Sequence, residues 1–209
     1  MAQIFTVHPT HPQPRLIRQA AEVLRDGGVI AYPTDSSYAL GCHIGDADAA
    51  KRIRRIRGVA EDHYLTLVLR DLSEIGRFAR LDNWQFRIIR LGTPGSYTFL
   101  VPATREVPRR LQHPKRSTVG VRVPDHAVAQ ALLAELNEPI LSSTLILPDA
   151  AEPLNDADAI GDAIGRQIDL VIDAGACPAE PTTVIDLAMP PGVVVRRGGG
   201  DPGRLGLDG

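Results

Sequence analysis

Hydroxyl groups and one carboxylate gather in the segment Thr34-Asp35-Ser36-Ser37, directly after a predicted strand at residues 29–32. Pro33 separates the two, and proline both ends a strand and restricts the backbone that follows it. A second apolar run, residues 38–42, leads the chain away again. Open α/β sheets bind ligands beyond the ends of their strands. The segment therefore predicts a polar binding site where a sheet opens.

Two arginines are placed where they can meet an anion. Arg57 ends a predicted helix that begins at Asp46 or Asp48 and stops at Gly58, so its side chain can project over the sheet edge. Arg122 lies in a valine-rich strand, on the face opposite the neighbouring valines. A buried arginine requires an anionic partner. That partner is either a carboxylate of the core or the carboxylate or phosphate of a ligand, and the residues alone leave both open.

Bulk composition narrows the function classes. The 209 residues are 44% apolar and only 4% aromatic, which suits one domain whose core is built from Val, Ile, Leu and Ala. The formal charge of −2 creates no general attraction for polyanions. The two cysteines and six histidines show no metal-like spacing, and neither a dinucleotide fingerprint nor a P-loop is present. Without a targeting segment or a run of roughly 18 apolar residues, we expect a reduced, cytoplasmic protein with no membrane contact.

Helical and strand patterns interleave along the chain without strict βαβ order. They predict a single α/β domain in which a twisted mixed sheet is flanked by helices. We expect an N-terminal extension at residues 1–13, the domain at 14–200 and a flexible tail at 201–209. No element is assigned within 149–167. Helices are predicted at 14–25, from 46 or 48 to 57, from 71, from 82, and at 126–136, and strands at 29–32, 38–42, 65–69, 97–101, 119–123, 140–144, 168–172, 182–187 and 193–196.

Five segments spread over residues 14–200 together resemble the YrdC-like family, which includes the enzymes that make threonylcarbamoyl-adenylate. The pattern is most similar to the YciO subgroup. The segments are Tyr32-Pro33-Thr34-Asp35, Thr118-Val119-Gly120-Val121-Arg122-Val123-Pro124, Pro139-Ile140-Leu141-Ser142-Ser143-Thr144, Thr182-Thr183-Val184-Ile185-Asp186 and Val194-Val195-Arg196-Arg197-Gly198.

The resemblance implies the YrdC-like fold and a nucleotidyltransferase that joins L-threonine, bicarbonate and ATP. Mg²⁺ would enter on the phosphates of ATP, with no permanent cofactor and no metal site in the protein. The product would serve the formation of threonylcarbamoyladenosine in tRNA. By the same resemblance, Thr34, Arg122, Ser142 and Thr182 hold threonine, whereas Arg57, His63, Thr118, Thr144 and Arg196 hold ATP, with Arg57 as the catalytic residue nearest the reacting phosphate.

The sequence departs from the family pattern at two places. The family's lysine and arginine fall on Arg57 and Val59, so one cation is replaced by an apolar side chain. The family's asparagine falls on Ile146, which cannot supply an amide's donors and acceptor. Loss of one well-placed group that stabilises transition-state charge costs about 2.7–4 kcal/mol, or roughly 100–1,000-fold in rate. We therefore expect an enzyme that is slow or altered in substrate.

Two alternatives stay open on the sequence. One is a binding protein for double-stranded RNA or the ribosome, without synthase activity, on the same scaffold; its candidate cations are the cluster at 51–57 with Arg105, Arg109, Arg110, Lys115 and Arg116. Such recognition is driven by shape and phosphate contacts, although the net charge is unusual for a dedicated RNA binder. The cations at Lys51 and Arg52 also suit an ordinary solvated helix face. The other alternative is carbamoyl-adenylate chemistry on a different acceptor.

Overall fold

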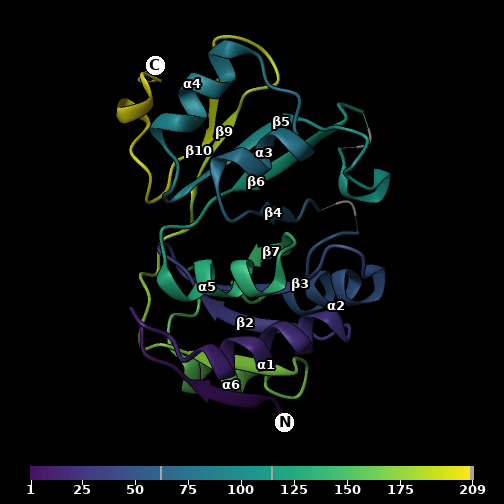
Figure 1. Cartoon of the computed structure of the whole chain (residues 1–209), viewed down its shortest axis with the longest axis vertical. Helices are drawn as coiled ribbons and strands as arrows, with labels where there is room; N and C mark the ends of the chain where they lie inside the picture. Colours follow the sequence, from purple (N-terminus) through teal and green to yellow (C-terminus); the bar gives the residue numbers. More distant parts are fainter. Residues whose placement is uncertain (62, 114, 208–209) are drawn as a thin grey trace.

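In the part of the chain that the structure describes, residues 1–61, 63–113 and 115–207, ten strands join into one mixed sheet (Figure 1). This computed structural model gives the strand order β1-β8-β2-β3-β7-β4-β6-β5-β9-β10. The strands are β1 (Gln3–Thr6), β2 (Ile30–Pro33), β3 (Tyr38–His43), β4 (Thr66–Val68), β5 (Tyr97–Pro102), β6 (Thr118–Arg122), β7 (Ile140–Thr144), β8 (Leu170–Asp173), β9 (Thr183–Asp186) and β10 (Val193–Arg196).

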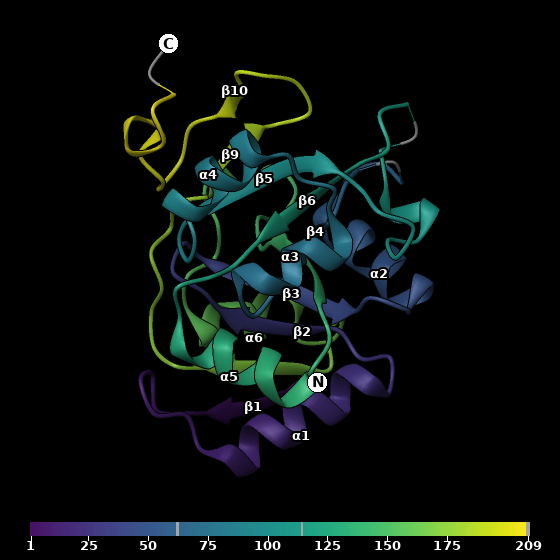
Figure 2. The same cartoon turned by 45° about the horizontal axis from the view of Figure 1, so that its top comes forward.

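Helices lie on both faces of the sheet (Figures 1 and 2). Helices α1 (Pro14–Arg25) and α5 (Ala127–Leu136) pack against each other and cover one face of β2 and β8. The opposite face carries α2 (Ala47–Arg57), α3 (Leu72–Phe78), α4 (Asn83–Leu91) and α6 (Ala157–Ile164). Two short 3₁₀ helices, η1 (Arg109–Leu111) and η2 (Pro202–Leu205), complete the described elements. The twisted mixed sheet flanked by helices confirms the fold class expected from the sequence.

Helix α2 is bounded by the signals that predicted it. The Asp46 carboxylate accepts hydrogen bonds from the amides of Asp48 and Ala49, at 2.9 and 2.8 Å. Gly58 follows the helix with φ of 62°, a left-handed conformation that favours glycine. These two ends determine where the last helical residue, Arg57, stands relative to the sheet.

Both ends of the chain differ from the sequence-based expectation. The expected N-terminal extension contains β1, which pairs in parallel with β8 in the register Gln3 to Leu170. The expected flexible tail contains η2, whose Pro202 and Leu205 are buried. Local sequence patterns do not predict the packing of these segments, because the residues they contact, such as Leu170 for Gln3 and Tyr97 for Asp201, are far away in the sequence. Helix α6, capped by Asp156, occupies part of the stretch to which no element was assigned.

The sheet face under α1 and α5 changes character along the strand order. Its buried apolar cluster includes Ile30, Ala39 and Val68 but, among the described residues, nothing from β5, β6 or β9. Beyond Val68 the same face carries polar side chains and Gly120. The sheet is covered by α3 and α4 only on the other side there (Figure 2). A polar depression over β4, β6 and β5 follows from this incomplete cover.

Candidate functional site

A pocket with a volume of about 180 Å³ opens on this polar face. Pockets for drug-sized ligands measure roughly 300–1,000 Å³. The enclosed part therefore suits a molecule of amino-acid size or one portion of a larger ligand. Its described lining comprises Ala39, Arg57, His63, Tyr64, Leu65, Thr66, Val68, Thr98, Leu100, Gly120, Arg122, Ser142, Ser143, Thr144, Thr182, Val184 and Arg196.

Strand register builds the pocket floor. Thr66 of β4 lies opposite both Gly120 of β6 and Ser142 of β7, so three neighbouring strands present small residues at one level. A Cβ atom at Gly120 would lie 3.3 Å from Thr66 Oγ1 and 3.5 Å from Thr98 Cγ2. The missing side chain at Gly120 keeps the floor low, and the surrounding hydroxyl groups make it polar.

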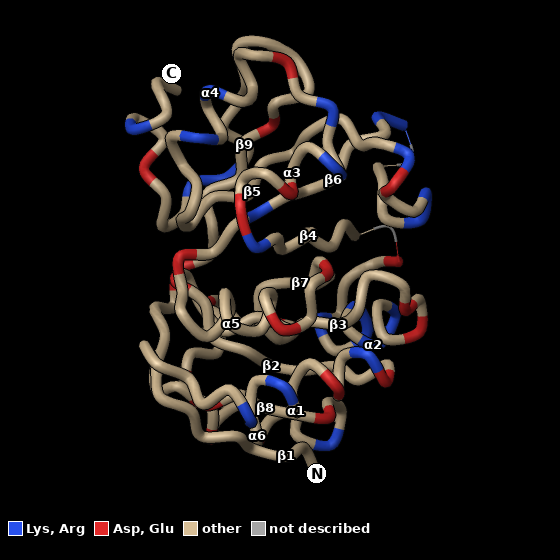
Figure 3. The backbone as a smooth tube through the Cα atoms, viewed as in Figure 1, with Lys and Arg blue, Asp and Glu red and all other residues tan. Residues whose placement is uncertain are grey.

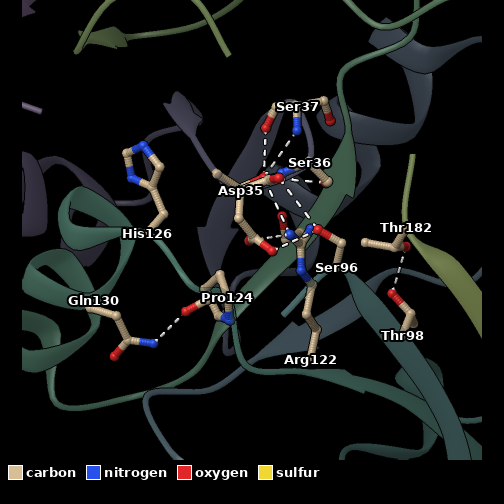
Figure 4. A network of polar contacts seen from close by, with 12 residues as sticks. Asp35, Ser36, Ser37, Ser96, Thr98, Arg122, Pro124, His126, Gln130 and Thr182 are labelled. Atoms are coloured by element: carbon tan, nitrogen blue, oxygen red, sulfur yellow. Dashed lines mark hydrogen bonds and ion pairs between the residues drawn. The ribbon is translucent and has the colours of Figure 1, made fainter. Parts of the chain in front are cut away.

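The buried arginine of β6 is paired with a carboxylate from the loop between β2 and β3. Arg122, only 7% exposed, donates from Nη2 to Asp35 Oδ1 at 2.5 Å (Figure 4). The Ser96 hydroxyl donates to the other carboxylate oxygen at 2.8 Å. The core carboxylate is thus one partner of Arg122. The Nε of Arg122, however, has no hydrogen-bond partner among the described residues, although the Arg122 side chain lines the pocket. An unsatisfied buried donor of this kind favours an acceptor supplied by a ligand.

Two further arginines, Arg57 and Arg196, also line the pocket. Arg57 donates from Nε to the Ser143 hydroxyl at 3.2 Å and from Nη1 to the Ile146 carbonyl oxygen. Arg196 donates from Nη2 to the Thr182 carbonyl oxygen at 2.8 Å. Burial lowers the pKa of both guanidinium groups, and repulsion from Arg196 lowers the pKa of Arg57 further. No carboxylate stands among the described lining residues, so the charge of these two arginines is uncompensated.

Hydroxyl groups of the pocket are oriented by hydrogen bonds. Tyr32, fully buried, donates to the Ser142 hydroxyl at 2.9 Å, and that hydroxyl donates to the Leu40 carbonyl oxygen at 2.9 Å. Burial raises the pKa of Tyr32 to about 12, which keeps the phenol neutral and able to donate. The hydroxyls of Thr98 and Thr182 lie 2.8 Å apart. Because its proton is committed to the Leu40 carbonyl, the Ser142 hydroxyl can take part in a further hydrogen bond only as an acceptor.

Most of the residues predicted to bind threonine or ATP meet in this one pocket. Seven of them line it: Arg57, His63, Arg122, Ser142, Thr144, Thr182 and Arg196. Thr34 does not line the pocket. It lies behind Arg122, whose Nη2 is 3.4 Å from the Thr34 hydroxyl. Thr118 lines a neighbouring hollow with Asp186. It shares the strand face of Arg122, yet four residues along a strand span about 13 Å, which is too far for one small pocket.

Sequence reasoning missed Thr66, Thr98 and Ser143 as lining residues. Thr98 follows the dipeptide Pro94-Gly95, and a Pro-Gly turn before a strand is common in proteins of any function. The signal that identifies Thr66 and Thr98 is alternation along β4 and β5, but it becomes informative only once their register with Gly120 is known. The structure also locates the two residues that depart from the family pattern. Val59 lies outside the described lining, and the backbone carbonyl of Ile146 accepts a hydrogen bond from Arg57.

The cations considered for RNA binding do not form a continuous free stripe. Several of them make contacts within the protein: Lys51 with Asp48, Arg52 with Asp169, Arg54 with the His63 carbonyl, Arg110 with the Ile44 and Gly45 carbonyls, and Arg116 with Asp186. These contacts occupy donors that a phosphate backbone would need.

Within residues 1–61, 63–113 and 115–207, no group of three or more His, Cys, Asp or Glu side chains is placed to hold a metal ion. None of the helices in these described ranges combines the length and the apolar character that crossing a membrane requires.

Known proteins resemble this chain along nearly its whole length. The family model Sua5_yciO_yrdC, described as "Telomere recombination", matches residues 22–198. YciO of Escherichia coli strain K12 is 51% identical over 201 residues, which cover 96% of this chain and 98% of that protein. A protein named threonylcarbamoyl-AMP synthase from Halorhodospira halophila is 33% identical over 165 residues, covering 78% of this chain and 85% of that protein.

Solved structures give the same picture. The crystal structure of E. coli YciO superposes with a TM-score of 0.95 at 50% identity. The match covers 98% of this chain and 100% of the YciO chain. The crystal structure of P. abyssi Sua5 complexed with L-threonine superposes with a TM-score of 0.85 at 28% identity, covering 94% of this chain and 57% of that chain.

Proposed function

Because the chain belongs to the Sua5/YciO/YrdC family, we propose that its pocket binds MgATP and L-threonine and joins them with bicarbonate into threonylcarbamoyl-adenylate. Relatives at 33% and 37% identity are named threonylcarbamoyl-AMP synthase, and a structural neighbour was crystallised with L-threonine. These names support the class of reaction.

The observation that carries the proposal is the uncompensated positive charge of Arg57 and Arg196 in a pocket whose described lining contains no carboxylate. The partly buried Arg57 and the exposed Arg196 repel each other, which raises the free energy of the empty site. A bound anion removes that repulsion and gains charge-assisted hydrogen bonds. Guanidinium groups match the geometry of phosphate oxygens. We assign the phosphates of ATP to these two arginines, with His63 and Thr144 beside them.

The threonine carboxylate is assigned to Arg122. Its unpartnered Nε supplies a donor, and the hydroxyls of Ser142 and Thr182 line the pocket close by. Asp35 holds the guanidinium in place from the other side, and Thr34 contributes through its contact with Arg122 rather than by touching substrate. Thr118 would meet only a part of the nucleotide that extends beyond the pocket.

The proposed reaction has two steps. The threonine amine attacks bicarbonate to give a carbamate and water. A carbamate oxygen then attacks the α-phosphorus of ATP, the bond to the β-phosphate breaks, and pyrophosphate leaves with its Mg²⁺. Negative charge that develops on the phosphates would be stabilised by Arg57, to which we assign the reacting phosphate. Since Val59 stands where the family pattern has a second cation, a rate roughly 100–1,000-fold below that of a two-cation site is expected. Other proteins would transfer the product to tRNA.

Threonine-dependent release of pyrophosphate from MgATP tests the proposal. Arg57→Ala should lower the rate by about 100–1,000-fold, while Arg55→Ala, an exposed arginine on the same helix, serves as the matched control. Wild-type protein that releases no pyrophosphate with threonine and bicarbonate would refute the synthase assignment. Equal losses in both variants would refute the role of Arg57. No contact described above gives specific support to the RNA-binding alternative.

A further inference from the structure

A second, larger hollow lies beside the loop that joins β5 to β6. Its volume is about 770 Å³, and its described lining includes Arg80, Arg105, Arg109 and His113 but no carboxylate. Figure 3 shows lysines and arginines gathered along this loop, at the right of the view beyond β6. The hollow is not one of the places where the threonine or ATP assignments above put a ligand.

The arginines of this hollow differ from their neighbours in having no side-chain partner among the described residues. No ion pair or side-chain hydrogen bond joins Arg80, Arg105 or Arg109 to any residue that the structure describes. Adjacent arginines are engaged instead: Arg116 is 3.0 Å from Asp186, and Arg110 donates to two backbone carbonyls. Three unpaired positive charges therefore face one hollow in a protein whose net charge is −2.

The loop that carries Arg105 and Arg109 is anchored to the body of the protein, whereas Arg80 lies between α3 and α4. Val107 and Leu111, 1% and 3% exposed, bury their side chains in the core. The side-chain amide of Gln112 donates to the Val107 carbonyl at 2.7 Å, and the backbone amide of Ala103 donates to the Ser117 carbonyl at 2.8 Å. The anchored loop keeps the exposed Arg105 and Arg109 at the lining of the hollow, where a bound anion would offset their positive charge.

One wall separates this hollow from the central pocket. The ring of Tyr64, which lines the pocket, stacks on the ring of His113, which lines the hollow, with 4.9 Å between ring centroids. The two cavities are therefore neighbours with different sets of arginines. A ligand in one leaves the arginines of the other available.

We propose that this hollow is a second anion site that binds a short oligophosphate chain, such as a diphosphate or triphosphate. Arg80, Arg105 and Arg109 line one hollow, so they fit a compact anion better than an extended backbone. Guanidinium groups bind phosphate oxygens through paired hydrogen bonds. The proposal is independent of the reaction assigned to the central pocket.

Calorimetric titration with inorganic tripolyphosphate tests the proposal. Wild-type protein should bind one equivalent in this hollow and, with phosphates held in the central pocket as assigned above, a second equivalent there. Arg105→Ser/Arg109→Ser should weaken one of the two sites by more than about tenfold, since each lost charge-assisted hydrogen bond is worth on the order of tenfold in affinity. Arg57→Ala/Arg196→Ala should weaken only the other site. The matched control, Arg87→Ser/Arg90→Ser, removes the same charge from exposed positions on α4 and should leave both sites unchanged.

Three results would overturn the proposal. The first is a single equivalent of tripolyphosphate on wild-type protein that Arg57→Ala/Arg196→Ala abolishes. The second is an equal loss in Arg105→Ser/Arg109→Ser and in the α4 control, which would show a general charge effect. The third is binding of a single-stranded RNA that depends on Arg105 and Arg109 while tripolyphosphate does not bind there. Loss of synthase activity with two intact tripolyphosphate sites would instead count against the proposed function alone.

Discussion

Removing the carboxylate that faces Arg122 should destabilise the protein strongly. In Asp35→Ala, the guanidinium of a side chain that is only 7% exposed loses its ion-pair partner, and the Ser96 hydroxyl loses its acceptor. Breaking a buried ion pair from one side costs about 3–5 kcal/mol, because an uncompensated charge remains in the interior. The pocket lets water reach one side of Arg122, so we expect the lower limit, about 3 kcal/mol. For a chain of this size that corresponds to a fall in Tm of about 6–12 °C.

Urea unfolding followed by circular dichroism measures this loss directly. The double variant Asp35→Ala/Arg122→Met should recover most of it, because an apolar side chain of similar size leaves no buried charge. Arg116→Ala is the control: it breaks an ion pair with Asp186 whose arginine is 62% exposed, and should cost less than about 1 kcal/mol. A loss below about 1 kcal/mol in Asp35→Ala, or a double variant no more stable than the single one, would refute the reasoning.

Three further predictions concern the pocket and its supports. Gly120→Ala should weaken threonine binding, measured by calorimetry, with a change in unfolding free energy below about 1 kcal/mol, since the new Cβ lies 3.3 Å from Thr66 Oγ1. Burial raises the pKa of Tyr32 from 10.0 to about 12, so its stabilising contribution is complete below pH 10 and lost as pH rises to 12; Tyr32→Phe should flatten the fall in urea midpoint over that range. Burial lowers the pKa of His126 below 6.5, so its contribution is complete above pH 6.5 and lost as pH falls; His126→Asn, which keeps a helix cap, should make urea midpoints at pH 5 and pH 7 more nearly equal.

Local signals in the sequence determined the elements more completely than the contacts between them. Asp46 and Gly58 bound α2, and the same two residues predicted where Arg57 would stand. Alternation along β6 predicted that Arg122 would point away from its valine neighbours, and it does line the pocket. In each case the cause lies within a few residues of its effect, which is why a single sequence was enough.

Contacts between strands that are distant in the sequence could not be predicted from these local signals. The partner of Arg122 stayed undecided between a core carboxylate and a ligand, because Asp35 comes within 2.5 Å only through pairings among strands that are distant in sequence. Thr118 was grouped with Arg122 by motif, whereas the spacing along β6 puts the two over different cavities. The unpaired state of Arg105 could not be predicted either, since it depends on which neighbouring cations find partners.

The position of β1 has a consequence for how the chain is made. Its partner strand is β8, in the register Gln3 to Leu170, so the two strands are 167 residues apart in the chain. A ribosome adds about 5–20 residues per second, and β1 therefore waits about 8–33 s before its partner emerges. During that interval its backbone donors and acceptors have no strand to pair with. The pairing of β1 with β8 must therefore form late in synthesis. A chaperone that covers β1 would act while its backbone groups are still unpaired.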